Sequence, residues 1–134
     1  MITVLYVDDD PDLLKLGILL SEKSEDIDLD IARSAFEALR KTASRTYECI
    51  ISDYRMPGMD GIEFLKQLRF NGDTTPFILF TSYDDDPEVK EETYRHGAFG
   101  VVDKDLAGKN AIHTLIRTIY WATLYRIHKT KGVS

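Results

Sequence analysis

The chain has 134 residues, of which 43% are hydrophobic, and it carries a formal net charge of −6 at pH 7. This length fits one ordinary soluble domain, and the acidic balance argues against a nucleic-acid-binding surface. The single cysteine, Cys49, excludes a disulfide framework and a cysteine-based zinc site, and its place in an apolar run predicts a small buried side chain.

Five apolar or alternating segments predict strands, and five longer segments with helical spacing predict helices. The strands are expected at residues 1–7, 27–31, 49–52, 77–80 and 98–102. The helices are expected at residues 12–23, 35–43, 61–70, 87–95 and 109–128. Because the two kinds of element alternate, we expect an α/β, flavodoxin-like three-layer sandwich, in which helices cover both faces of a doubly wound, five-stranded parallel sheet.

Local signals mark several of these elements. The pairs Asp10-Pro11 and Asp86-Pro87 each place a capping acid before a proline at the first helical position. Ser34 and Glu37 have the spacing of a capping box at the start of the second helix. Residues 27–31 alternate apolar and acidic side chains, which predicts an edge strand with one face open to water.

Four of the predicted strands end in polar residues. These residues are Asp8 and Asp9, Asp53, Thr81 and Ser82, and Lys104. In a doubly wound sheet, ligands bind in the crevice outside the carboxyl ends of the strands, so we expect the aspartates to converge there with Thr81 and Lys104 beside them. Each residue alone has an ordinary explanation as a helix cap, a strand-end hydroxyl or a surface lysine. Their joint position is what indicates a site.

The chemistry of this set points to a phosphoryl group. Carboxylates that share a crevice repel one another, which raises their pKa values unless a cation compensates. Magnesium binds one or two carboxylates while keeping water and phosphate oxygens as further ligands. Lys104 adds a positive point charge on a flexible side chain. A metal and a lysine would neutralise the phosphoryl oxygens while an aspartate attacks phosphorus to form an aspartyl phosphate.

These residues resemble the receiver domain of two-component response regulators, and the resemblance covers nearly the whole chain. Its landmarks are Val7-Asp8-Asp9-Asp10, Asp53-x-x-Met56-Pro57-x-Met59-Asp60-Gly61, Phe80-Thr81-Ser82, and Gly97-Ala98 followed by Lys104. The resemblance implies the strand order 2-1-3-4-5 and a receiver domain over residues 1–128, with residues 129–134 as a tail or the start of a linker. It also implies a phosphoacceptor switch in the cytoplasm rather than an enzyme, one that is loaded by a sensor histidine kinase or a phosphotransfer protein.

The resemblance assigns roles to the residues at the strand ends. Asp53 would accept the phosphoryl group in a reaction that depends on Mg²⁺, with Mn²⁺ as an alternative cation. Asp9, Asp53 and the backbone carbonyl of Arg55 would bind the metal directly, and Asp8 would act mainly through water. The groups that hold the phosphoryl oxygens would be the Thr81 hydroxyl, the Ser82 backbone amide and the Lys104 ammonium. Phosphorylation would then rearrange the face formed by the fourth helix, the fifth strand and the fifth helix, and so control a partner or an output domain outside this chain.

The sequence departs from the family pattern in two places. Val101 stands where the family often has an aromatic switch residue, which puts the usual coupling to Thr81 in question. Asp105 replaces a proline that follows the lysine on a cis bond, and a cis bond before another residue costs about 3 kcal/mol. We therefore expect a trans bond between Lys104 and Asp105, or strain that the site supports. Arg55 and Tyr83 occupy variable positions near the phosphate, and their bulk predicts slow self-dephosphorylation.

The last helix combines a core stripe with aromatic side chains beside it. The core stripe is predicted at Ile112, Leu115, Ile116, Ile119 and Ala122. The side chains that lie partly off the stripe are Tyr120, Trp121, Leu124, Tyr125 and His128. These five side chains either fold back on the domain or form an interface. The interface would be a homodimer face or the place where the helix runs on into another domain. The histidines His96, His113 and His128 have no metal-ligand spacing. No apolar run approaches the roughly 18 residues that a membrane span needs, and no signal peptide opens the chain.

Two other functions remain open at this stage. The first is a magnesium-dependent phosphohydrolase of the haloacid dehalogenase type, for which Asp8-x-Asp10 is a superficial match with Asp8 as nucleophile. The short chain leaves little room for a substrate cap, and Pro11-Asp12 replaces the continuation expected there. The second is a pseudo-receiver that binds partners without phosphoryl chemistry, although such a protein would usually have lost the acceptor, an acid or the lysine.

Overall fold

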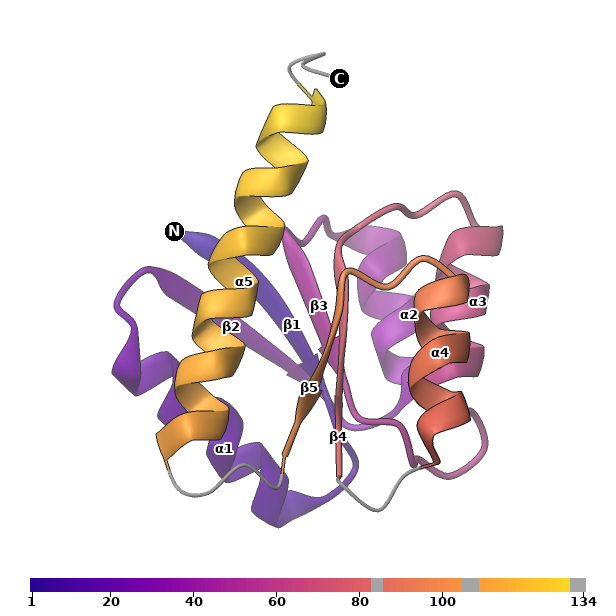
Figure 1. The fold of residues 1–134 in the computed structure, drawn as a ribbon, viewed down its shortest axis with the longest axis horizontal. Helices are drawn as coiled ribbons and strands as arrows, with labels where there is room; N and C mark the ends of the chain where they lie inside the picture. Colours follow the sequence, from indigo (N-terminus) through magenta and orange to yellow (C-terminus); the bar gives the residue numbers. More distant parts are fainter. Residues whose placement is uncertain (83–85, 105–108, 131–134) are drawn as a thin grey trace.

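The computed structural model describes residues 1–82, 86–104 and 109–130. The strands are β1 (Ile2–Val7), β2 (Ile27–Ala32), β3 (Cys49–Ser52), β4 (Phe77–Thr81) and β5 (Gly100–Asp103). The helices are α1 (Pro11–Lys23), α2 (Ala35–Ser44), α3 (Gly61–Phe70), α4 (Pro87–Arg95) and α5 (Lys109–Thr130). The strands form one parallel sheet in the order β2-β1-β3-β4-β5, and Figure 1 shows α1 and α5 on one face with α2, α3 and α4 on the other. The predicted fold and strand order are confirmed.

The register of the sheet aligns the carboxyl ends of its inner strands. Val7 at the end of β1 lies opposite Ser52 at the end of β3, and Thr81 at the end of β4 lies opposite Asp103 in β5. The residues that follow these positions therefore emerge together at one edge of the sheet, which is the lower edge in Figure 1. This alignment is what places the polar strand-end residues side by side.

The core has two layers because the sheet is buried on both faces. Val4 and Tyr6 of β1 belong to the layer that packs under α1 and α5, together with Ile119 of α5. Leu5 of β1 belongs to the layer on the other face, with Phe64 of α3. Alternate residues of one strand thus enter opposite layers, which explains why the inner strands read as continuous apolar runs.

Two helix starts differ in detail from the sequence prediction. The Ser34 hydroxyl accepts a hydrogen bond from the Glu37 amide at 3.0 Å, as expected, but the Glu37 carboxylate accepts from the Arg33 amide and not from that of Ser34. The predicted capping box is therefore only half formed. A complete box, which the sequence analysis did not predict, stands at α3, where Asp60 and Glu63 each accept from the other's backbone amide.

The last strand and the last helix also begin or end away from their predicted bounds. Ala98 and Phe99, which were expected in the fifth strand, precede β5, and the Ala98 amide donates to the Thr93 carbonyl as α4 ends. Helix α5 continues to Thr130, two residues into the predicted tail, and residues 131–134 lie outside the described residues. None of the helices in the described part of the chain is both long and apolar enough to cross a membrane.

Candidate functional site

Backbone hydrogen bonds that continue the sheet hold the site residues in place. The Asp8 amide donates to the Ala32 carbonyl at 3.0 Å, and the Asp53 amide donates to the Val7 carbonyl at 2.9 Å. The Lys104 amide donates to the Thr81 carbonyl at 2.8 Å. These bonds extend the strand pairing one step beyond the strands themselves. The backbone amides of Asp8, Asp53 and Lys104 are therefore held in register with the sheet.

Three carboxylates converge at this edge. Asp8, Asp9 and Asp53 each offer an oxygen, and these oxygens all lie within 4.8 Å of one another. Asp8 is buried, Asp53 is partly buried and Asp9 is exposed. Burial raises the pKa of the Asp8 carboxyl to about 6, although the Asp10 amide, which donates to it at 3.0 Å, and the charge of Lys104 act in the opposite direction. The prediction that these aspartates share one crevice is borne out by the geometry.

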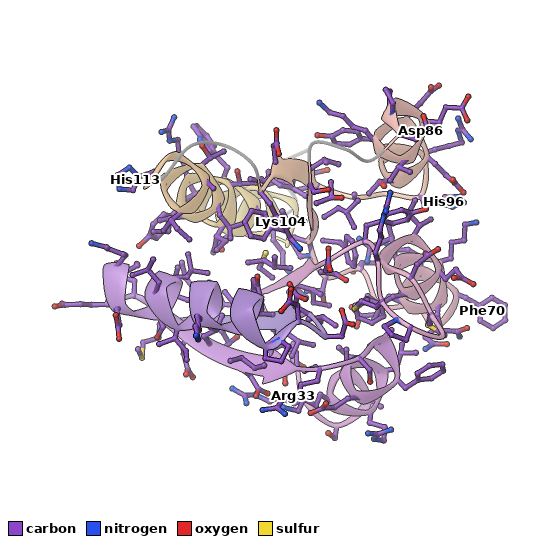
Figure 2. The ribbon with its side chains drawn as sticks, turned by 90° about the horizontal axis from the view of Figure 1, so that it is seen from below. Arg33, Phe70, Asp86, His96, Lys104 and His113 are labelled. Atoms are coloured by element: carbon purple, nitrogen blue, oxygen red, sulfur yellow. The ribbon has the colours of Figure 1, made fainter. Side chains whose placement is uncertain are left out.

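Lys104 reaches into the middle of this cluster. Its Nζ atom lies 2.7 Å from Asp53 Oδ1 and 3.5 Å from Asp8 Oδ2. The Tyr54 amide also donates to Asp53 Oδ1, at 2.8 Å. The Lys104 ammonium further lies 5.7 Å from the centroid of the Phe80 ring, within the range of a cation–π contact. Figure 2, viewed from the carboxyl ends of the strands, shows Lys104 near the centre of the molecule.

The Thr81 hydroxyl is an unusual group in this setting. Thr81 is buried, and its Oγ1 atom has no hydrogen-bond partner among the residues that the structure describes. A buried hydroxyl without a partner costs about 1–3 kcal/mol relative to a satisfied one. The neighbouring Ser82, partly buried, follows directly after β4.

The donor set suits a hard divalent cation. Carboxylate oxygens are the ligands that Mg²⁺ prefers, and a buried acid whose pKa is raised lacks full compensation for its charge. Arg55, whose carbonyl was expected to join them, lies in the loop after β3 with an exposed side chain. The residues at this edge therefore fit the metal that the sequence predicts.

The structure adds Gly61 to the site, a residue that the sequence analysis used only as a landmark. Its amide donates to the Tyr54 carbonyl at 2.7 Å. A Cβ atom on residue 61 would collide with the Asp53 carbonyl oxygen and would lie 2.9 Å from a methyl group of Leu79. Only glycine lets the start of α3 approach the end of β3 this closely. In the sequence, the pair Asp60-Gly61 after a proline-glycine loop could have indicated this close approach.

The two departures from the family pattern have different outcomes. Val101 is partly buried, and its amide donates at 3.2 Å to the hydroxyl of Tyr94, which comes from α4. An aromatic residue therefore does lie beside this position, but it comes from a neighbouring helix. Tyr83, Asp105 and the bond between Lys104 and Asp105 lie outside the described residues, so the predictions for them stay predictions.

The side chains of α5 divide as the sequence analysis allowed. The core stripe is confirmed for Ile112, Leu115, Ile119 and Ala122, which are buried, and Ile116 packs partly buried against them. Tyr120 folds back, since its hydroxyl lies 2.8 Å from Ser24 Oγ and 3.3 Å from Asp26 Oδ2. By contrast Trp121, Leu124 and Tyr125 are exposed by 62%, 49% and 56%.

Neither His96 nor His113, the two histidines whose side chains are described, lies at the site. Figure 2 shows His96 and His113 toward the periphery, away from Lys104. His96 Nε2 lies 3.9 Å from a Glu92 carboxylate oxygen, and His113 is exposed. The side chain of His128 is not among those described. Among the described residues, the one group that could hold a metal consists of aspartates alone.

Comparisons with known proteins agree with this geometry. The family model of the response regulator receiver domain matches residues 4–117. The DNA-binding transcriptional regulator NtrC of Escherichia coli K12 is 35% identical over 83 residues, which cover 62% of this chain and 18% of that protein. The transcriptional regulatory protein FixJ of Bradyrhizobium diazoefficiens is 32% identical over 103 residues, which cover 75% of this chain and 48% of that protein. The chain thus spans less than half the length of these curated relatives.

Solved structures give the same result. A Francisella response regulator 1452 receiver domain superposes with a TM-score of 0.79 at 30% identity, covering 94% of this chain and 99% of the other. The chemotaxis response regulator CheY4 of Vibrio cholerae superposes with a TM-score of 0.76 at 31% identity, covering 88% of this chain and 98% of the other.

Proposed function

The chain belongs to the response regulator receiver domain family, and from that premise we propose that Asp53 is the phosphoacceptor of a cytoplasmic two-component switch. The observation that carries the proposal is the position of Asp53 at the end of β3, with the Lys104 ammonium 2.7 Å from Oδ1 and two further aspartates beside it. The phosphoryl donor would be the phosphohistidine of a sensor histidine kinase or of a phosphotransfer protein.

The transfer uses the two oxygens of Asp53 differently. Oδ1 accepts hydrogen bonds from the Tyr54 amide and the Lys104 ammonium, which leaves Oδ2 as the oxygen that attacks phosphorus. The new bond joins Oδ2 to phosphorus while the phosphorus–nitrogen bond of the phosphohistidine breaks. The electron pair of that bond stays on the imidazole nitrogen, which is then protonated. The product is an acyl phosphate on Asp53 and a free histidine on the donor.

The divalent cation would be held directly by Asp9, Asp53 and the backbone carbonyl of Arg55, with Asp8 acting mainly through water. Mg²⁺ is the expected ion, with Mn²⁺ as an alternative, because all of these groups offer hard oxygens. When bound, the cation supplies positive charge that offsets the charge of the phosphoryl oxygens. Asp8 contributes a carboxylate whose raised pKa would fall again once that charge is present.

The switch would begin at Thr81 and Lys104. A phosphoryl oxygen would give the unpartnered Thr81 hydroxyl an acceptor, the Ser82 amide would bind another oxygen, and Lys104 would leave Asp8 for the phosphoryl group. Each contact exists only in the phosphorylated state, so each biases the equilibrium between two arrangements of the α4–β5–α5 face. Val101 has no aromatic ring that could move between exposed and buried positions. The coupling between the phosphoryl site and the α4–β5–α5 face would therefore run through the backbone of β5 in this chain.

The output would be a partner protein or a domain outside this chain. The exposed side chains of Trp121, Leu124 and Tyr125 on α5 would form the interface, which would be a homodimer face or the contact with that domain. Arg55, exposed beside the site, and Tyr83 would limit the access of water to the phosphoryl group and so slow its loss.

The test is intact mass spectrometry after incubation with a small phosphodonor, with and without Mg²⁺. We expect one phosphoryl adduct that requires Mg²⁺ and disappears in the Asp53→Asn variant. An Asp28→Asn variant is the matched control, because Asp28 is an exposed aspartate on the edge strand β2. An adduct in both variants would place the phosphate elsewhere. No adduct in any protein, with no binding of Mg²⁺, would refute the proposal in favour of a pseudo-receiver.

A further inference from the structure

A cavity of about 740 Å³ lies at the end of the sheet opposite Asp53. Arg69 at the end of α3, Pro76 before β4, Phe99 before β5, and Tyr125 and Arg126 of α5 contribute to its lining. Figure 1 shows that the beginnings of β4 and β5 and the C-terminal half of α5 lie away from the carboxyl ends of the strands. The cavity is therefore separate from the phosphorylation site.

The charge of this cavity is opposite to that of the protein. Among the described residues, two guanidinium groups and no carboxylate line it, although the chain as a whole carries a charge of −6. Arg69 donates to the backbone carbonyls of Asp73, at 2.9 Å, and of Gly97, at 3.1 Å, and Arg126 donates to the Tyr47 carbonyl at 2.8 Å. These bonds to backbone carbonyls fix the orientation of the two guanidinium groups.

Arg69 is also partly removed from water. Burial lowers the pKa of its guanidinium, while the nearby charge of Asp73 acts in the opposite direction. The Asp73 carboxylate itself accepts hydrogen bonds from the Thr75 amide, at 2.9 Å, and from the Thr75 hydroxyl, at 2.6 Å. A partly desolvated cation gains more from an incoming anion than one in full solvent.

The rest of the lining is apolar and aromatic. The rings of Phe99 and Tyr125 lie 5.8 Å apart at an angle of 46°, and Pro76 contributes a further apolar surface. The volume falls within the range of small-molecule sites, which combine apolar walls with a few oriented polar groups. From the two guanidiniums and these rings we infer that the cavity binds a small anion with an aromatic body, namely an aromatic carboxylate or phosphate ester.

Such a ligand would join elements that are distant in the sequence. Its anionic group would contact Arg69 of α3 and Arg126 of α5, and its ring would lie against Phe99 and Tyr125. The ligand would therefore fasten the C-terminal half of α5 to the amino ends of β4 and β5. This role does not depend on phosphorylation of Asp53, so the site can be tested on the unphosphorylated chain.

The experiment is a titration of the ¹⁵N-labelled protein with phenyl phosphate, benzoate and inorganic phosphate, followed by amide chemical shifts. We expect saturable shifts at Gly97, Ala98 and Thr74, and we expect phenyl phosphate or benzoate to bind about tenfold or more tightly than inorganic phosphate. Whichever aromatic probe binds more tightly identifies the anionic group, phosphate or carboxylate, that the site prefers. Shifts confined to the surroundings of Asp53 and Lys104 would overturn the proposal, because they would show binding at the other site only.

Variants separate the two parts of the cavity. Arg126→Gln should weaken the preferred aromatic probe about tenfold or more, since a charge-assisted hydrogen bond is lost. Tyr125→Ala should weaken binding of the aromatic probe but leave binding of inorganic phosphate unchanged. This variant tests the inference if Arg126→Gln does not fold. Arg95→Gln, on the exposed side of α4 outside this cavity, is the matched control. Wild-type affinity in both cavity variants would refute the inference.

Discussion

The raised pKa of Asp8 makes a specific prediction for the stability of the metal-free protein. The carboxyl titrates at an ordinary 3.8 when unfolded and at about 6 when folded, chiefly because burial disfavours its charge. The folded state therefore binds the proton more tightly, so stability is lost as the pH rises from about 4 to 6 and stays lost above that range. At about 1.4 kcal/mol per unit of pKa, the difference between the two pKa values corresponds to roughly 3 kcal/mol of folding free energy. We expect about 2 kcal/mol of this, because solvent screens the exposed end of the site.

Asp8→Asn removes this penalty, because an amide has no charge to bury. Its Oδ1 can still accept the hydrogen bond from the Asp10 amide, and Lys104 keeps its partner Asp53. We expect the variant to be more stable than the wild type by about 2 kcal/mol at pH 7.5, and by close to zero near pH 4.

The assay is urea denaturation of both proteins in EDTA at a series of pH values, with Asp28→Asn as the control for an exposed aspartate. The difference in free energy between wild type and Asp8→Asn should grow between pH 4 and pH 6 and then level off. A variant that is less stable at every pH, or a difference that does not change with pH, would refute the reasoning. Added Mg²⁺ should stabilise the wild type more than the variant, since the proposed site would bind the cation only in the folded state.

Three further substitutions test the packing of the site and of α5. Thr81→Val replaces the buried hydroxyl that has no described partner, and it should raise the urea-derived free energy of unfolding by about 1 kcal/mol while leaving the phosphoryl adduct less stable. Gly61→Ala places a methyl group against the Asp53 carbonyl, and it should lower the same free energy by more than about 2 kcal/mol. Tyr120→Phe removes the hydroxyl that bonds Ser24, and it should lower the thermal midpoint in circular dichroism by a few degrees, for a loss of about 1 kcal/mol.

The fold could be predicted from the sequence because its strongest signals are local. The inner strands are apolar on both faces, and the pair Asp86-Pro87 fixes the start of α4. The position of Asp53 followed from the same reasoning, since a polar residue directly after a buried strand must lie at the edge of the sheet. The haloacid dehalogenase alternative fails because the receiver family model covers residues 4–117.

Other features depend on contacts that no local pattern records. The capping box at Ser34 is half formed and the one at Asp60 is complete, because the two glutamate side chains accept hydrogen bonds from different backbone amides. Tyr120 and Trp121 are neighbours in an aromatic run, yet one bonds Ser24 and the other is exposed, because successive residues of a helix point about 100° apart. The arginine cavity joins residues from α3, the segments before β4 and β5, and α5, so its charge could not be foreseen from any one segment.

Helix α5 links the two proposed sites, and this arrangement makes a last prediction. Its first residue, Lys109, comes five positions after Lys104 in the sequence, and its C-terminal half lines the arginine cavity. If phosphorylation of Asp53 moves α5, the affinity of the cavity for its ligand must change by some factor, and the ligand must change the equilibrium constant of phosphorylation by the same factor. A typical coupling of 1–3 kcal/mol would change the affinity for phenyl phosphate about 5- to 150-fold. Titrating the phosphorylated protein and Asp53→Asn side by side measures this factor. Equal affinities would mean that the phosphoryl signal leaves the domain without displacing the C-terminal half of α5, which would make α4 and β5 its carriers.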